Sequence, residues 1–126
     1  MKRILLIEDQ MTDALLLQEW LFDAGVTWEV HEVATFAAAQ AAWAAGPFDA
    51  MLLDLDLPDG YGLELLERAL TLAGHVPVVV LSGNADPGLS ASVRALGGAG
   101  QVLKGEAQLG ALLSLLDLLW SGAPRR

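Results

Sequence analysis

Short apolar runs recur along the chain, and each is followed by a segment with helical spacing. The clearest runs are residues 3–7 (RILLI), 48–54 (FDAMLLD) and 76–83 (VPVVVLSG), and two further strand-like segments are residues 27–33 and 99–104. Helical patterns follow over residues 12–25, 35–46, 61–74, 87–98 and 106–120. Strands that alternate with helices in this way predict an α/β fold, in which helices cover both faces of one parallel sheet.

The composition of the strands predicts their order. The three apolar runs suit central strands, because a strand between two helical layers is buried on both faces. Residues 27–33 instead alternate Trp28 and Val30 with Glu29 and His31, as an edge strand with one wet face would. Right-handed crossovers then favour a doubly wound, five-stranded sheet of order 2-1-3-4-5, the flavodoxin-like (β/α)5 arrangement.

Length, charge and hydropathy narrow the class of protein. A chain of 126 residues is predicted to form a single domain over residues 1–126, and it contains no Cys that could form a disulfide or a thiolate metal site. The net charge is −9, and no Lys or Arg stands between Ile4 and Glu67, so we expect no binding to nucleic acid. No apolar run approaches the length of a membrane span or of a signal peptide, so we expect a cytoplasmic protein without membrane contact.

Polar side chains stand where the predicted strands end. They are Glu8 and Asp9 after the first strand, Asp54 and Asp56 after the third, Ser82 after the fourth and Lys104 after the fifth. The carboxyl ends of parallel strands meet at one edge of a sheet, so these groups should lie close together. Neighbouring carboxylates repel one another unless their pKa values rise or a cation lies among them, and a donor set of oxygens favours Mg²⁺.

The same groups suit phosphoryl transfer. A carboxylate such as that of Asp54 can act as a nucleophile and form an aspartyl phosphate. This chemistry depends mainly on positioning and on neutralising charge, which Mg²⁺ and Lys104 would supply. The Ser82 hydroxyl and backbone N–H groups near Asp56 and Gly83 could bind the remaining phosphoryl oxygens.

Four segments together resemble the receiver domain of two-component response regulators, the CheY-like domains. They are LLIED, DAMLLDLDLPDGYGLELL, VPVVVLSG and the Lys of GQVLKGE, which occur in the family's order over almost the whole chain. The resemblance implies that Asp54 is the phosphoacceptor, that Ser82 moves onto the phosphoryl group, and that Lys104 pairs with carboxylate or phosphate. It also implies a Mg²⁺ site formed by Asp9 directly, Glu8 through water, Asp54, and the backbone carbonyl of Asp56.

The resemblance also implies partners. Receiver domains take the phosphoryl group from a sensor histidine kinase or a histidine phosphotransfer protein. They catalyse the phosphorylation and dephosphorylation of their own aspartate, so we expect a phosphoacceptor and not an enzyme. We expect a stand-alone regulator with no output domain, which relays its signal by contact with a separate downstream protein. The very apolar segment at residues 109–120 (LGALLSLLDLLW) is explained either by burial in the core or by a homodimer contact.

Two positions depart from the family pattern. Gln101 stands three residues before Lys104, where receivers usually carry an aromatic residue, and Gly105 stands where a Pro usually follows the Lys. These departures put the usual aromatic switch and the shape of the following loop in doubt. They leave open a pseudo-receiver that binds partners without being phosphorylated.

A second alternative is a phosphatase of the haloacid dehalogenase type, whose Asp-x-Asp motif resembles Asp54 and Asp56. In those enzymes, however, the Asp-x-Asp comes on the first strand and the acidic pair comes last, the reverse of the order here.

We also expect the Asp56 carboxylate to slow hydrolysis of an aspartyl phosphate, because it adds negative charge to a site rich in carboxylates, and Asn84 offers no base on the opposite flank.

Overall fold

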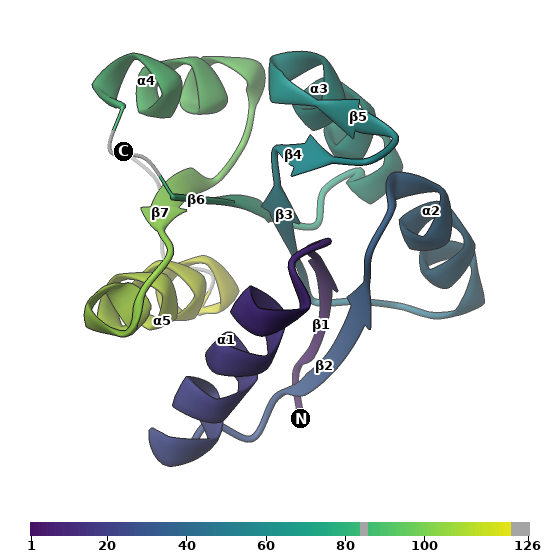
Figure 1. The fold of residues 1–126 in the computed structure, drawn as a ribbon. Helices are drawn as coiled ribbons and strands as arrows, with labels where there is room; N and C mark the ends of the chain where they lie inside the picture. The colour runs from purple at the N-terminus through teal and green to yellow at the C-terminus, as the bar shows by residue number, and fades with distance from the viewer. Residues whose placement is uncertain (84–85, 122–126) are drawn as a thin grey trace.

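A computed structural model describes residues 1–83 and 86–121 (Figure 1), so Asn84 and the last five residues lie outside the described part of the chain. The strands are β1 (Arg3–Ile7), β2 (Glu29–Val33), β3 (Ala50–Asp54), β4 (Asp56–Leu57), β5 (Gly60–Tyr61), β6 (Val78–Ser82) and β7 (Gly100–Leu103). The helices are α1 (Met11–Asp23), α2 (Phe36–Ala45), α3 (Gly62–Ala73), α4 (Pro87–Leu96), the 3-10 turn η1 (Glu106–Gln108) and α5 (Leu109–Trp120).

The main sheet is parallel, and its strands have the order β2-β1-β3-β6-β7. Counted along this sheet alone, the order is 2-1-3-4-5, so the predicted doubly wound topology is confirmed. The apolar runs of β1, β3 and β6 form the buried centre of the sheet, whereas β2 lies at one edge with Glu29, His31 and Glu32 exposed. The prediction that the three apolar strands are central and that β2 is an edge strand is therefore confirmed.

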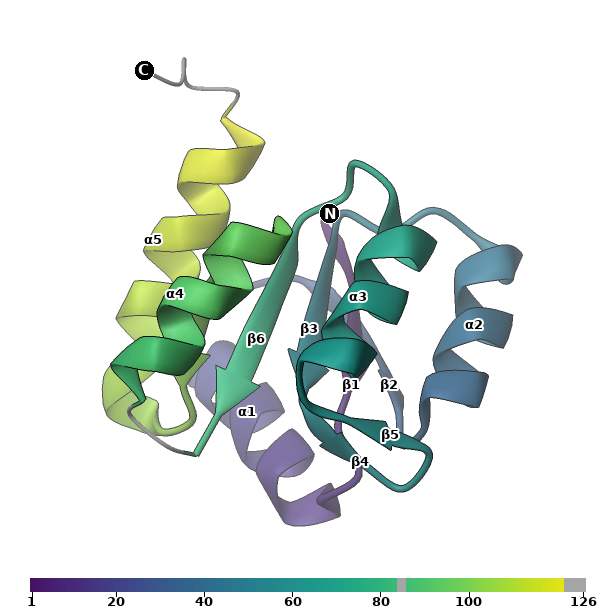
Figure 2. The same ribbon diagram turned by 90° about the horizontal axis from the view of Figure 1, so that it is seen from above.

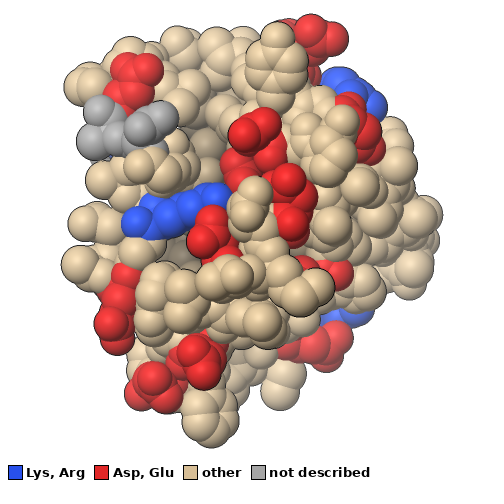
Figure 3. All heavy atoms as spheres, in the orientation of Figure 1, with Lys and Arg blue, Asp and Glu red and all other residues tan. Residues whose placement is uncertain are grey.

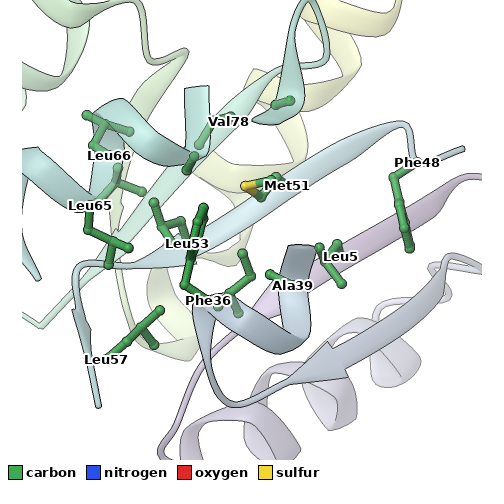
Figure 4. Packing of buried hydrophobic residues seen from close by; sticks show 14 of the residues in the cluster. Leu5, Phe36, Ala39, Phe48, Met51, Leu53, Leu57, Leu65, Leu66 and Val78 are labelled. Carbon is green, nitrogen blue, oxygen red and sulfur yellow. The ribbon is translucent and has the colours of Figure 1, made fainter. Parts of the chain in front are cut away.

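Helices cover both faces of this sheet (Figures 1 and 2). Helices α1 and α5 pack on one face, and α2, α3 and α4 pack on the other. In Figure 4, Phe36 of α2 and Leu65 of α3 lie against Leu53 of β3, and all three side chains are at most 1% exposed. Each such side chain contributes about 1.5–3 kcal/mol on burial, so the end of β3, and with it Asp54, is held in a fixed position.

Core packing accounts for most of the apolar character of α5. Leu112 and Leu116 are buried, and Leu118 is 59% exposed. At the end of this helix, the indole N–H of Trp120 donates a hydrogen bond of 2.9 Å to the Asp49 carbonyl, and its ring meets that of Trp28 edge-on at 5.4 Å. Trp28 and Trp120 therefore contribute to packing at this end of the helix.

The segment between β3 and α3 forms a second, smaller sheet. Strands β4 and β5, two residues each, form a small antiparallel hairpin. Its exit is made by Gly62, which adopts a positive φ of 68° and donates its N–H to the Leu55 carbonyl at 2.7 Å. Glycine adopts this backbone conformation without a steric penalty, so the hairpin can lead directly into α3.

Within residues 1–83 and 86–121, no helix combines the length and the apolar character that crossing a bilayer requires.

Candidate functional site

The strand register brings the predicted site residues to one edge of the sheet. Asp54 ends β3 beside Leu81 of β6, and Ser82 ends β6 beside Leu103 of β7. The Lys104 N–H then donates a hydrogen bond of 2.8 Å to the Ser82 carbonyl. On this side of the molecule, Figure 3 shows acidic side chains gathered around a basic one. The prediction that these residues converge is confirmed.

Lys104 lies at the centre of the acidic groups. Its ammonium forms an ion pair with Glu8 and lies 3.0 Å from Asp54 Oδ2 and 3.1 Å from Asp13 Oδ2. Burial by itself would lower the pKa of Lys104, but the hydrogen bonds with these carboxylates outweigh burial and raise that pKa above its ordinary value. Lys104 therefore stays charged, and its positive charge faces Asp54 directly.

The Asp54 carboxylate is held at both oxygens. Oδ1 accepts a hydrogen bond of 3.0 Å from the Asp56 N–H, and Oδ2 contacts Lys104. The side chain is 13% exposed and borders a cleft of about 290 Å³, together with Asp9, Asp56 and Ser82. An oriented carboxylate that borders an open cleft can act as a nucleophile toward a group that enters the cleft.

Three carboxylates form a group that could hold a cation. Glu8, Asp9 and Asp54 each offer an oxygen within 4.8 Å of the others. Burial, together with a hydrogen bond to Asp54, raises the pKa of Glu8 to about 7. A hard cation with oxygen ligands would relieve this crowding of negative charge, so the donor set fits Mg²⁺. The predicted ligation by the Asp56 carbonyl stays a prediction.

Two acidic residues have contacts that the sequence interpretation did not assign. Asp13 of α1 pairs with Lys104 across 91 positions of sequence separation. Asp59, in the β4–β5 turn, accepts hydrogen bonds of 2.9 Å each from the N–H groups of Phe36 and Ala37, the first residues of α2. These bonds lower the pKa of Asp59. The position of Asp13 just after the acidic pair, in the first turn of the predicted helix, was an available signal for its contact with the site.

The comparison with known families decides the assignment. The family model of the response regulator receiver domain matches residues 4–116. The chain belongs to this receiver family. Membership also argues against the phosphatase alternative, because the order of motifs along the chain is the receiver's order. Receiver domains are generally not enzymes with separate substrates, and they bind Mg²⁺ or Mn²⁺ at an acidic site like the one described above.

Among curated proteins, the receiver is similar to the swarming motility regulation protein RssB of Serratia marcescens, with 37% identity over 81 residues. That match covers 63% of this chain and 35% of RssB, so the chain spans about a third of its relative.

Solved structures share the fold over nearly the whole chain. A CheY-like receiver domain protein of Methanospirillum hungatei is 26% identical, with a TM-score of 0.79 over 98% of this chain and 99% of its own. The phosphorylated cyanobacterial phytochrome response regulator RcpA is 27% identical, with a TM-score of 0.73 over 98% of this chain and 96% of its own. These likenesses confirm the receiver fold.

Gln101 and Gly105, the two residues that depart from the receiver pattern, both lie at or after the last strand of the sheet. Gln101 lies in β7 and borders an open cleft with Asp86 and Ser90, at the side of the sheet that α4 covers. Gly105 adopts a positive φ of 135°, which the ring of a Pro could not adopt because it fixes φ near −65°. The loop after β7 therefore has a shape of its own in this receiver, as the sequence indicated.

Proposed function

We propose that this receiver accepts a phosphoryl group on Asp54 from a sensor histidine kinase or a histidine phosphotransfer protein, in a Mg²⁺-dependent reaction. The observation that carries the proposal is the Asp54 carboxylate at the cleft, oriented by the Asp56 N–H and by Lys104. The family membership supports a regulator that passes its signal through protein contacts.

In the proposed transfer, one Asp54 oxygen attacks the phosphorus of a phosphohistidine. The new P–O bond forms as the P–N bond breaks, and the leaving imidazole takes up a proton. Lys104 neutralises charge that develops on the phosphoryl oxygens, and the Ser82 hydroxyl binds one of them. Hydrolysis later returns the carboxylate, when water attacks phosphorus and inorganic phosphate leaves.

The proposed cation site uses the acidic group at the same edge. Asp9 would bind Mg²⁺ directly, Glu8 through water, and Asp54 and the Asp56 carbonyl would complete the protein ligands. Mg²⁺ bound there would neutralise negative charge on the phosphoryl oxygens. The geometry of the acidic group supports this assignment, because Glu8, Asp9 and Asp54 each offer an oxygen within 4.8 Å of the others.

Further parts of the proposal concern the cellular setting. We propose a cytoplasmic protein that contacts its kinase or phosphotransfer partner transiently and then a downstream protein. A homodimer through α5 stays a prediction, which light scattering of the phosphorylated and unphosphorylated protein would test. Stand-alone action is likewise a prediction, tested by the intact mass of the protein isolated from its own cells.

Incubation with acetyl phosphate and Mg²⁺, followed by intact-mass measurement, tests the proposal. The wild type should gain one phosphoryl group, whereas Asp54→Asn should gain none, because the amide keeps the side chain's shape without its nucleophilicity. Asp117→Asn is the matched control, since this exposed carboxylate lies on α5, and it should be phosphorylated like the wild type. A chelator should abolish the gain in the wild type and in Asp117→Asn.

The same experiment decides between the proposal and the pseudo-receiver alternative. A wild-type protein that gains no phosphoryl mass with either Mg²⁺ or Mn²⁺ would support a module that binds partners without phosphorylation. Full phosphorylation of Asp54→Asn would place the acceptor on another residue.

A further inference from the structure

Asp13 makes a contact that the proposed function does not use. It lies in the first turn of α1, and its Oδ2 is 3.1 Å from the Lys104 ammonium. The family resemblance assigns it no role. Its side chain is 43% exposed, compared with 13% for Asp54 and 2% for Glu8, so Asp13 is the most solvated of the three carboxylates around Lys104.

The number of donors on Lys104 limits what it can bind. An ammonium has three N–H groups, and three carboxylates already contact this one. A phosphoryl oxygen on Asp54 would also need a donor from Lys104. Glu8 is buried, and Asp54 would carry the phosphoryl group itself. Asp13 is therefore the partner that a phosphoryl oxygen can replace with the smallest loss of free energy, because the Asp13 carboxylate can turn toward water.

The position of Lys104 shows what Asp13 does before that replacement. Lys104 borders the cleft of Asp54 on one side. It also borders a small cavity of about 40 Å³ between α1 and α5, lined by Asp13, Leu17 and Trp20 among others. Asp13 thus contacts the ammonium from outside the lining of the cleft that a phosphoryl group would enter.

We propose that Asp13 is a positioning residue that competes with the phosphoryl group for Lys104 and thereby weakens the phosphorylated state. The inference rests on the proposed function of Asp54. Its physical basis is the balance of charge. The negative charge of the Asp13 carboxylate offsets part of the positive charge of Lys104 and so weakens the attraction between Lys104 and a phosphoryl anion. Removing the Asp13 charge should strengthen the hold of Lys104 on that anion.

The test measures the affinity of the purified protein for beryllofluoride, a phosphoryl mimic, in saturating Mg²⁺ by titration calorimetry. Asp13→Asn should bind the mimic roughly three- to tenfold more tightly than the wild type, the range expected for one partly solvated charge a few ångströms away. Asp13→Glu, which keeps the charge, should return the affinity toward the wild-type value. Glu19→Gln removes an exposed charge from the middle of the same helix and should change the affinity less than twofold.

A merely structural role predicts a different pattern. If Asp13 served only the N-terminus of α1, its replacement would lower the urea midpoint and leave the affinity for the mimic unchanged. Equal or weaker binding by Asp13→Asn overturns the inference while wild-type binding leaves the proposed function standing. A wild type that does not bind beryllofluoride with Mg²⁺ overturns both.

Discussion

Asp59 links the turn after the acceptor strand to α2, and its removal gives a defined prediction. Its two carboxylate oxygens accept hydrogen bonds from the N–H groups of Phe36 and Ala37, and the Thr35 hydroxyl accepts one from Ala38. Together these bonds satisfy the first three N–H groups of the helix, which have no partner within the helix itself. Asp59→Ala would leave two of them to water.

The size of the effect follows from the capping role and from exposure. Loss of a capping side chain costs about 0.5–2 kcal/mol, and the solvated position of Asp59 favours the middle of that range. We expect about 1 kcal/mol lower free energy of unfolding at pH 7, or roughly 3–5 °C in Tm for a chain of this length. Asp59→Asn should lie between the wild type and Asp59→Ala, because its amide oxygen accepts a hydrogen bond without charge.

The pH dependence gives a second readout. The bonds to α2 lower the pKa of Asp59 in the folded state. A carboxyl group with a depressed folded pKa adds stability above its unfolded pKa of about 3.9 and loses it as the pH falls through the folded value. Urea unfolding should therefore show a constant gap between wild type and Asp59→Ala above about pH 5, which narrows below pH 4 as the carboxyl group loses its charge. Equal midpoints at pH 7, or a gap that does not narrow at the lowest pH, would refute the capping role.

Three further predictions concern the acidic edge. Mg²⁺ at tenfold its Kd should raise the free energy of unfolding by about 1.4 kcal/mol in the wild type and by much less in Asp9→Ala, and an unchanged increment would place the ion elsewhere. The pKa of Glu8 is raised to about 7, so the folded state binds this proton more tightly than the unfolded chain does. In the presence of a chelator, the free energy of unfolding should therefore fall as the pH rises from about 4.5 to 7, by at most about 3 kcal/mol. Glu8→Gln should flatten this slope, and an equally steep slope in that variant would assign the titration to another group. Phosphorylated Asp56→Asn should lose its phosphoryl group faster than the wild type at saturating Mg²⁺, whereas slower loss would mean that the Asp56 carboxylate assists hydrolysis.

The strand order and the site were predictable because both follow from short patterns. Continuous apolar residues identify β1, β3 and β6 as central strands, and a parallel sheet must bring their carboxyl ends together. Asp54 and Lys104 could therefore be placed at one edge without knowledge of any side-chain conformation. Their contact of 3.0 Å agrees with that placement.

The remaining features depend on tertiary placement. Strands β4 and β5 have two residues each, too few for an alternating pattern to appear in the sequence. Asp59 caps a helix that begins 23 residues earlier in the chain, and that pairing arises only when the hairpin folds over the start of α2. The contact of Asp13 with Lys104 likewise depends on how α1 lies beside the end of β7. Local sequence carries no distance information for such pairs.

The identity of the acceptor residue is the central claim, and chemical mapping of the phosphorylated site tests it most directly. Protein phosphorylated with acetyl phosphate and Mg²⁺ is treated with borohydride, which reduces an aspartyl phosphate to homoserine, and is then digested and sequenced by mass spectrometry. The account predicts homoserine at position 54, with Asp9, Asp13 and Asp56 remaining aspartate. Homoserine at any of those three positions, with Asp54 unmodified, would contradict it.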